Sequence, residues 1–290
     1  MKRVRKAVFP VAGLGTRVLP ATKTIPKEML TVVDRPLIHY VVEEARAAGI
    51  EHFVFVTGRG KSSMEDYFDH AVELEATLGA KKKTALLEEL TSALPTEGEI
   101  SYVRQMQPLG LGHAVWCARD IVGDEPFAVV LPDMIMDAEP GALAQCLRAY
   151  EDAGGGNLVM VEPCPPEDTH KYGIVAVEDR QGRLSRMTGM VEKPAAADAP
   201  SNLFISGRYV LQPEIFAHLS KRQTGAGGEI QLTDAMAGLM GEQPFHALEY
   251  EGTTYDCGDK IGLLRANVAM ALKRPDLAEA ARAAVSDLLK

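Results

Sequence analysis

Short apolar strands alternate with helices along the first half of the chain, and this alternation limits the possible folds more than any other feature. Apolar runs of strand length occupy residues 6–11, 52–57, 100–104, 127–131 and 157–161. Segments with helical spacing of apolar residues lie between them, at residues 36–48, 113–121 and 141–152. This order of elements predicts βαβ units and a mainly parallel sheet in an α/β fold.

The rhythm changes after about residue 165. Strands are predicted at residues 174–177, 183–192 and 204–211, with few helices between them. Parallel neighbours need a long crossover, whereas antiparallel neighbours do not. We therefore expect this part to add antiparallel or mixed strands to the sheet.

Two segments stand outside this pattern. Residues 61–92 are expected to form an inserted helical hairpin, and residues 259–289 are rich in alanine and leucine and are expected to be helical. The length of 290 residues lies near the upper size of a single hydrophobic core. We therefore expect one domain spanning residues 1–290.

Charge and composition exclude several classes of protein. With 40 acidic and 31 basic residues the net charge is -9, which argues against binding to nucleic acid. No apolar stretch reaches the roughly 18 residues that a membrane span needs. The 4 cysteines form no CxxC pair, which argues against a disulfide framework or a zinc site and favours a reducing, cytoplasmic location.

A glycine-rich segment directly follows the first predicted strand. Gly13 and Gly15 allow backbone N–H groups to approach phosphate closely, and Arg17 and Lys27 add positive charge nearby. The dinucleotide-binding fingerprint needs a third glycine at the position that Val18 holds. The segment therefore favours a polyphosphate ligand over a nicotinamide dinucleotide.

A second glycine segment, residues 58–62, ends in Gly-Lys-Ser like a P-loop. The first glycine of that motif would fall at position 55, which Phe55 occupies within a predicted strand. We therefore interpret the segment as a turn between a strand and a helix.

A third glycine segment begins where the strand at residues 100–104 ends. Gln105 offers one hydrogen-bond donor and one acceptor, which match the O4 and N3–H edge of uracil or thymine. Gly110 lies in the glycine loop that follows, before the predicted helix. On these residues alone, a loop whose glycines serve only turns remains an equal alternative.

Acidic and basic residues at strand ends complete the candidate site. Asp133 follows a buried strand, and Asp256 is a second carboxylate far along the chain. Carboxylates at the carboxyl ends of parallel strands face the binding crevice, and Mg²⁺ is their natural partner beside a polyphosphate. Glu192 and Lys193 end another strand and could bind a sugar and its phosphate, although a surface ion pair is the simpler interpretation. Asp259 is predicted to cap the following helix.

Taken in order, these motifs resemble one enzyme family. The strings GLGTR at residues 13–17, PKEML at 26–30, LPD at 131–133 and EKP at 192–194 resemble the sugar-1-phosphate nucleotidylyltransferases. LPATK at 19–23, QPLGLGHAV at 107–115, APSNL at 199–203 and DCG at 256–258 narrow the resemblance to bacterial members that act on UTP and glucose 1-phosphate. The resemblance covers about residues 5–270.

The resemblance implies a Rossmann-like three-layer α/β/α fold with a mixed, mainly parallel sheet, a sugar-binding part at about residues 165–258, and a homodimer or homotetramer. It implies transfer of a uridylyl group from UTP to glucose 1-phosphate, giving UDP-glucose and pyrophosphate, with Mg²⁺ as cofactor. The net charge and the lack of a long apolar stretch predict no nucleic acid or membrane as partner. Nucleotide-binding residues would be Ala12, Gly13, Gly15, Gln105 and Gly110. Catalytic residues would be Arg17, Lys27 and Lys193, metal ligands Asp133 and Asp256, and sugar-binding residues Gly173, Glu192 and Lys193.

Two other functions share this pattern. A thymidylyltransferase acting on dTTP would keep the core motifs, although such enzymes usually lack helices like those expected at residues 61–92. A non-catalytic nucleotide-sugar sensor would keep the fold. Loss of Lys27, Asp133 or Lys193 would favour the sensor, and all three residues are present.

Overall fold

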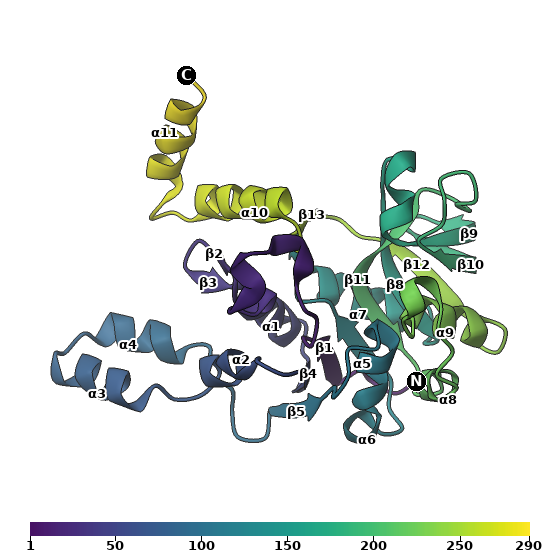
Figure 1. Ribbon diagram of the computed structural model, residues 1–290, viewed down its shortest axis with the longest axis horizontal. Coiled ribbons are helices and arrows are strands. Elements are labelled where there is room, and N and C mark those ends of the chain that lie inside the picture. Colours follow the sequence, from purple (N-terminus) through teal and green to yellow (C-terminus); the bar gives the residue numbers. More distant parts are fainter.

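A nine-stranded sheet forms the centre of the molecule, which we describe over residues 1–290 from a computed structural model (Figure 1). Its strand order is β5 (Ile100–Arg104), β4 (His52–Thr57), β1 (Lys6–Pro10), β6 (Phe127–Val130), β11 (Leu203–Leu211), β8 (Asn157–Pro163), β12 (Phe245–Glu249), β10 (Leu184–Glu192) and β9 (Gly173–Gln181). All the strands predicted before residue 165 form. Strand β12 is not among the predicted strands.

The sheet is mixed, as expected. Strands β5, β4, β1 and β6 are parallel neighbours, whereas β11 runs antiparallel to both β6 and β8. Strand β12 is parallel to β8, and β10 is antiparallel to both β12 and β9. The antiparallel pairings of this sheet therefore all involve strands after about residue 165, where the sequence stops alternating between strands and helices.

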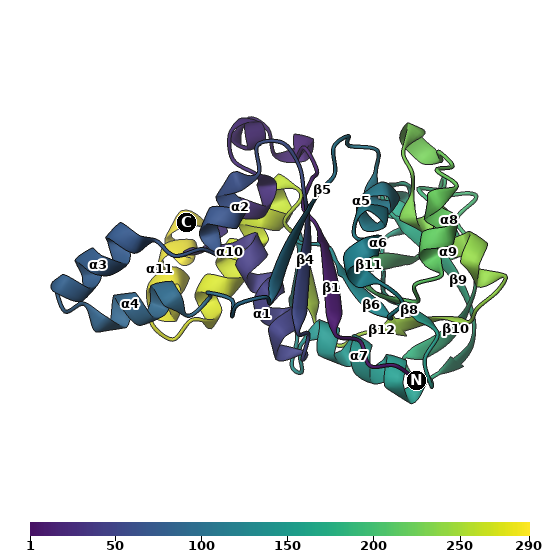
Figure 2. The same ribbon diagram turned by 90° about the horizontal axis from the view of Figure 1, so that it is seen from below.

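Helices cover both faces of the sheet (Figure 2). Helices α1 (Leu37–Ala47) and α7 (Ala142–Asp152) pack into one buried apolar cluster. Helices α5 (Leu111–Cys117), α8 (Ile215–Ser220) and α9 (Leu232–Met240) pack into a second cluster, and α6 (Arg119–Val122) follows α5. The helix predicted at residues 113–121 is thus divided into two, and α8 and α9 were not predicted.

Two small sheets lie beside the main one. Strands β2 (Thr31–Val32) and β3 (Arg35–Pro36) form a short hairpin. Strand β7 (Met134–Asp137) pairs in antiparallel register with β13 (Thr253–Asp256), which joins segments more than 100 residues apart. This second pairing positions part of the candidate site.

Three helices, not the expected two, form between residues 61 and 92: α2 (Ser62–Tyr67), α3 (Val72–Ala80) and α4 (Thr84–Thr91). The C-terminal segment forms α10 (Lys260–Lys273) and α11 (Ala278–Leu288). Helices α3, α4 and α11 bury no residue, and they project from the body of the molecule (Figures 1 and 2). No helix has both the length and the apolar character that crossing a membrane requires.

One buried ion pair connects the sheet to the loop after β6. Arg208, on β11, is fully buried, and its Nε and Nη2 bind Glu44 of α1 at 3.0 and 2.6 Å. Its remaining N–H groups donate to the carbonyl oxygens of Leu131, Gly207 and Met134 at 3.1, 3.2 and 2.9 Å. The carbonyls of Leu131 and Met134 flank Asp133, so this guanidinium fixes the backbone that carries a candidate metal ligand.

Because Arg208 is buried, removing its partner should be strongly destabilising. We expect Glu44→Ala to lower the free energy of unfolding by about 3–5 kcal/mol, since it leaves an uncompensated buried charge. Urea unfolding measures this change. The control is Glu178→Ala, which breaks an exposed pair with Arg186 and should lower stability by less than about 1 kcal/mol. Equal losses in the two variants would contradict the role assigned to the buried pair.

Candidate active site

The segment after β1 folds over the carboxyl end of that strand as three short 3₁₀ turns, η1 (Thr16–Val18), η2 (Ala21–Lys23) and η3 (Lys27–Met29). Gly15 has a left-handed φ of 65°, and its carbonyl accepts a hydrogen bond from Thr22 Oγ1 at 2.7 Å. A β-carbon at Gly15 would lie 3.1 Å from side-chain atoms of Thr22 and Lys27. Glycine therefore lets η1, which carries Arg17, pack closely on η3, which carries Lys27.

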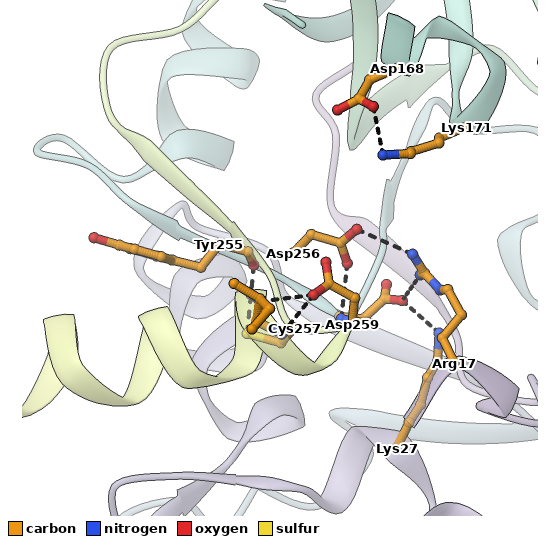
Figure 3. Close-up of polar contacts among 12 residues, drawn as sticks. Arg17, Lys27, Asp168, Lys171, Tyr255, Asp256, Cys257 and Asp259 are labelled. Carbon is orange, nitrogen blue, oxygen red and sulfur yellow. Dashed lines mark hydrogen bonds and ion pairs between the residues drawn. The ribbon is translucent and has the colours of Figure 1, made fainter. Parts of the chain in front are cut away.

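Two cations and two carboxylates meet below these turns (Figure 3). Lys27 Nζ lies 2.6 Å from Asp133 Oδ2, and Arg17 binds the same oxygen at 3.4 Å. The other terminal nitrogen of Arg17 binds Asp256 Oδ2 at 3.2 Å. The structure thus brings together all four residues that the sequence analysis assigned to the triphosphate and the metal.

Asp256 reaches this position through the pairing of β13 with β7. Asp256 lies opposite Met134, and the backbone N–H of Cys257 donates to the carbonyl of Asp133 at 2.8 Å. Gly258 N–H then donates to Asp256 Oδ1 at 2.9 Å. A β-carbon at Gly258 would lie 2.3 Å from Arg17 and 2.8 Å from each carboxylate, so a side chain there would displace the charged groups of this cluster.

The charges in the cluster shift one another's pKa. Burial alone would raise the pKa of Asp133, but the charge of Lys27 and its hydrogen bond, with Arg17, outweigh burial and lower it. Burial would lower the pKa of Lys27, but the carboxylates of Asp133 and Glu28 raise it. The pKa of Asp256 is raised, because burial and the neighbouring Asp133 outweigh Arg17. Lys27 is therefore an ammonium ion and Asp133 a carboxylate at neutral pH.

Gln105 lies at the end of β5 and is buried, as a base-reading residue would need to be. Its backbone N–H donates to the carbonyl of Thr57 on the neighbouring strand at 2.8 Å. Its side-chain Nε2 donates to Gly110 O at 3.1 Å and contacts His113 Nδ1 at 3.0 Å. Both amide hydrogens are thus used within the loop, which leaves Oε1 as the group that can accept from a base.

Gly110 and Gly112 let the loop after Gln105 pack closely against Glu229 and Ile230, which precede α9. Gly110 has a φ of 106°, and a β-carbon there would lie 2.7 Å from Glu229 Cβ and 2.8 Å from Ile230 O. Gly112 N–H donates to Ile230 O at 2.8 Å. These glycines therefore serve close packing, and they fix the loop whose carbonyl orients Gln105.

Glu192, Gly173 and Lys193 come together where β9 and β10 pair. Gly173 lies opposite Glu192 in the register, and Thr233 Oγ1 of α9 donates to Glu192 Oε2 at 2.7 Å. Lys193 has a left-handed φ of 48° and its backbone N–H donates to Tyr172 O at 2.9 Å. Its ammonium group is half-exposed and lies 3.5 Å from Glu192 Oε1. Sequence reasoning missed Thr233, because nothing in its neighbours links it to a strand 41 residues earlier.

Tyr172 connects this corner to the carboxylates. Its ring packs on Phe204 with centroids 4.5 Å apart, and both line a hollow of about 230 Å³ with Asp256 and Asp259. The carboxylate of Asp256 contributes, after burial, to raising the pKa of Tyr172. The corner formed by Gly173, Glu192 and Lys193 and the charged cluster are therefore neighbours.

Tyr255 and Asp259, which lie close to Asp256 in the sequence, have structural roles. Tyr255 packs against the apolar cluster around Val32 and Leu37, and it points away from Arg17 (Figure 3). Asp259 caps α10 as predicted, with Oδ1 accepting from the N–H groups of Ile261 and Gly262 at 2.8 and 2.9 Å.

Comparison with known proteins shows which family the chain resembles over its length. The nucleotidyl transferase family model matches residues 6–272. A UTP–glucose-1-phosphate uridylyltransferase of Bacillus subtilis (strain 168) is 50% identical over 277 residues, covering 96% of this chain and 94% of the relative.

Two solved structures extend the comparison. A UTP-bound UGPase from Acinetobacter baumannii has a TM-score of 0.91 and 45% identity, covering 98% of this chain and 99% of that one. A UDP-glucose pyrophosphorylase complexed with UDP-glucose has a TM-score of 0.83 and 41% identity, covering 93% and 100%. Because the family model and the Bacillus subtilis relative match nearly its whole length, the chain belongs to the nucleotidyl transferase family.

Proposed function

We propose that this protein transfers the uridylyl group of UTP to glucose 1-phosphate, producing UDP-glucose and pyrophosphate. The observation that carries the proposal is the meeting of Arg17 and Lys27 with Asp133 and Asp256 at the carboxyl end of the sheet. Two anionic substrates can react only where their charge is neutralised, and this cluster supplies both cations and metal ligands. The curated relative from Bacillus subtilis and the UTP-bound and UDP-glucose-bound structures support the choice of substrates.

Asp133 and Asp256 fit a magnesium ion. Both supply carboxylate oxygens, the donors that Mg²⁺ prefers, and both already bind one cation, the guanidinium of Arg17. The chain has no group of three or more His, Cys, Asp or Glu side chains suited to a metal. Mg²⁺ is commonly held by one or two carboxylates together with substrate phosphates. When bound there it would neutralise phosphate charge and help to orient the α-phosphate.

The uracil would lie between the two glycine loops, in contact with Ala12, Gly13 and Gly110. Gln105 Oε1 is the free group of its amide, so it would accept from uracil N3–H. Gly15 keeps η1 on η3, so the charges of Arg17 and Lys27 would face the triphosphate together.

Glucose 1-phosphate would lie beside Glu192, Gly173 and Lys193. Thr233 holds one oxygen of Glu192, which leaves the other to accept from sugar hydroxyls. Lys193 places a half-exposed ammonium group next to that carboxylate, where it would bind the phosphate of the sugar.

The reaction would then be a direct displacement at phosphorus. A phosphate oxygen of the sugar attacks the α-phosphorus of UTP, and pyrophosphate leaves on the opposite side. Arg17 and Lys27 would exchange their carboxylate partners for phosphate oxygens, and Lys193 would hold the attacking group in line. Neutralisation and alignment therefore supply the catalysis.

We also propose that the fold is a Rossmann-like α/β/α domain in which residues 61–92 form an inserted hairpin. The protein would assemble into a homodimer or homotetramer. Helices α3 and α4 support both parts, because they bury nothing in one copy and expose Val72, Leu74 and Leu86.

Pyrophosphate release tests the function directly. With Mg²⁺, release should require both glucose 1-phosphate and UTP. CTP should be poorer by roughly 10-fold or more, because its N3 is an acceptor and leaves Gln105 Oε1 unpaired at about 1–3 kcal/mol. Faster turnover of dTTP than of UTP would instead identify a thymidylyltransferase, and binding without release would identify a sensor.

Replacing Lys193 tests the sugar-phosphate subsite. We expect Lys193→Ala to raise KM for glucose 1-phosphate by roughly 10- to 100-fold, since a charge-assisted contact to phosphate is worth about 1.5–3 kcal/mol. KM for UTP should change little. Lys171→Ala is the matched control, because Lys171 is a nearby half-exposed lysine that pairs with Asp168 at 2.6 Å (Figure 3). A larger effect on UTP than on the sugar phosphate would move Lys193 to the triphosphate subsite.

A further inference from the structure

The glycine segment at residues 58–62 has no part in the function described so far, yet it contains a buried lysine. Lys61 precedes α2 and is only 6% exposed. Its Nζ lies 2.8 Å from Oε2 of Glu28, which is fully buried on η3. Fully buried lysine and glutamate side chains are rare unless they are paired, so this pair needs a reason.

The segment and the residue before it contact both loops that would hold the nucleotide. A β-carbon at Gly58 would lie 3.3 Å from Ala12 Cβ and 3.4 Å from its carbonyl oxygen, so the backbone of Gly58 packs directly on that loop. The residue before it, Thr57, accepts the backbone hydrogen bond of Gln105 at 2.8 Å. Lys61 then contacts η3, the turn that carries Lys27, through its pair with Glu28.

Charge gives Lys61 its specific importance. Glu28 is the chain neighbour of Lys27, and its carboxylate attracts the Lys27 ammonium as well as that of Lys61. Lys27 Nζ nevertheless bonds to Asp133, while Glu28 Oε2 takes Lys61 and Glu28 Oε1 has no partner. After Lys61, Lys27 is the cation that acts most strongly on Glu28, so a Glu28 carboxylate that lost Lys61 would attract Lys27 instead.

We propose that Lys61 is a positioning residue for the nucleotide. By neutralising Glu28, it leaves the charge of Lys27 directed toward Asp133 and the incoming triphosphate. Lys61 itself is buried, with its ammonium group paired to Glu28, and would not touch the substrate. This inference rests on the proposed function, because it takes the ligand of Lys27 to be a nucleoside triphosphate.

A set of charge variants distinguishes this electrostatic role from the alternative that the Lys61–Glu28 pair only holds the turn in place. Calorimetry measures the affinity for UTP with Mg²⁺ in wild type, Lys61→Met, Glu28→Gln and the double variant. Lys61→Met should bind UTP at least 10-fold more weakly, whereas the double variant, which removes both charges, should return to within about 3-fold of wild type. Glu28→Gln should bind UTP no more weakly than wild type, and this result holds even if Lys61→Met fails to fold.

A mechanical support predicts the opposite order. In that case both single variants would weaken UTP binding and the double variant would be at least as weak as either, which would overturn the proposal. Unchanged affinity in Lys61→Met would overturn it as well. Lys6→Met is the control for lost stability, because Lys6 pairs with Glu125 beside α6, away from the nucleotide loops, and should lower Tm without changing UTP affinity. If wild type neither bound UTP nor released pyrophosphate, the proposed function would fail instead.

Discussion

Asp133 and Asp256 share one guanidinium, and the rest of the site depends on keeping these two like charges together in a largely buried place. Burial and mutual repulsion both oppose two ionised carboxylates. Arg17 and Lys27 offset this repulsion by pairing with the two carboxylates. In the proposed reaction the same cations would bind phosphate oxygens, so the arrangement that stabilises the two carboxylates also suits a metal–nucleotide complex.

The surrounding fold can be understood as support for that cluster. Arg208 and Glu44 fix the turn that carries Asp133, and the pairing of β13 with β7 brings Asp256 to it. On the nucleotide side, Lys61 and Glu28 support the turn that carries Lys27. Each support comes from a distant part of the chain, and none of them involves the exposed helices α3, α4 and α11.

The sequence predicted the parts of this structure that have local signals. Apolar patterning predicted the strands of the first half, and helix-start chemistry predicted the cap at Asp259. The family resemblance predicted that Arg17 and Lys27 would lie near the two aspartates. Strand β13 has no such signal, because it is short and only half-buried. Sequence patterns also assigned no role to Arg208 or Lys61. Their buried partners, Glu44 and Glu28, lie far from them along the chain, so only the folded structure identifies these pairs. Gln105 was predicted to use both ends of its amide, and the structure shows that its donor end serves the loop.

The central claim is that this site aligns and neutralises its substrates and contributes no nucleophile. Burial, with Asp256 and Asp133, raises the pKa of Cys257 to about 12, so its thiol stays protonated. His113 is held by Gln105, and Lys27 stays an ammonium ion. The most direct measurement is the configuration at phosphorus after turnover of a single isomer of α-thio-UTP with glucose 1-phosphate, read by ³¹P NMR. The account predicts inversion, from one displacement. Retention would require two displacements through a nucleotidyl-enzyme and would contradict it.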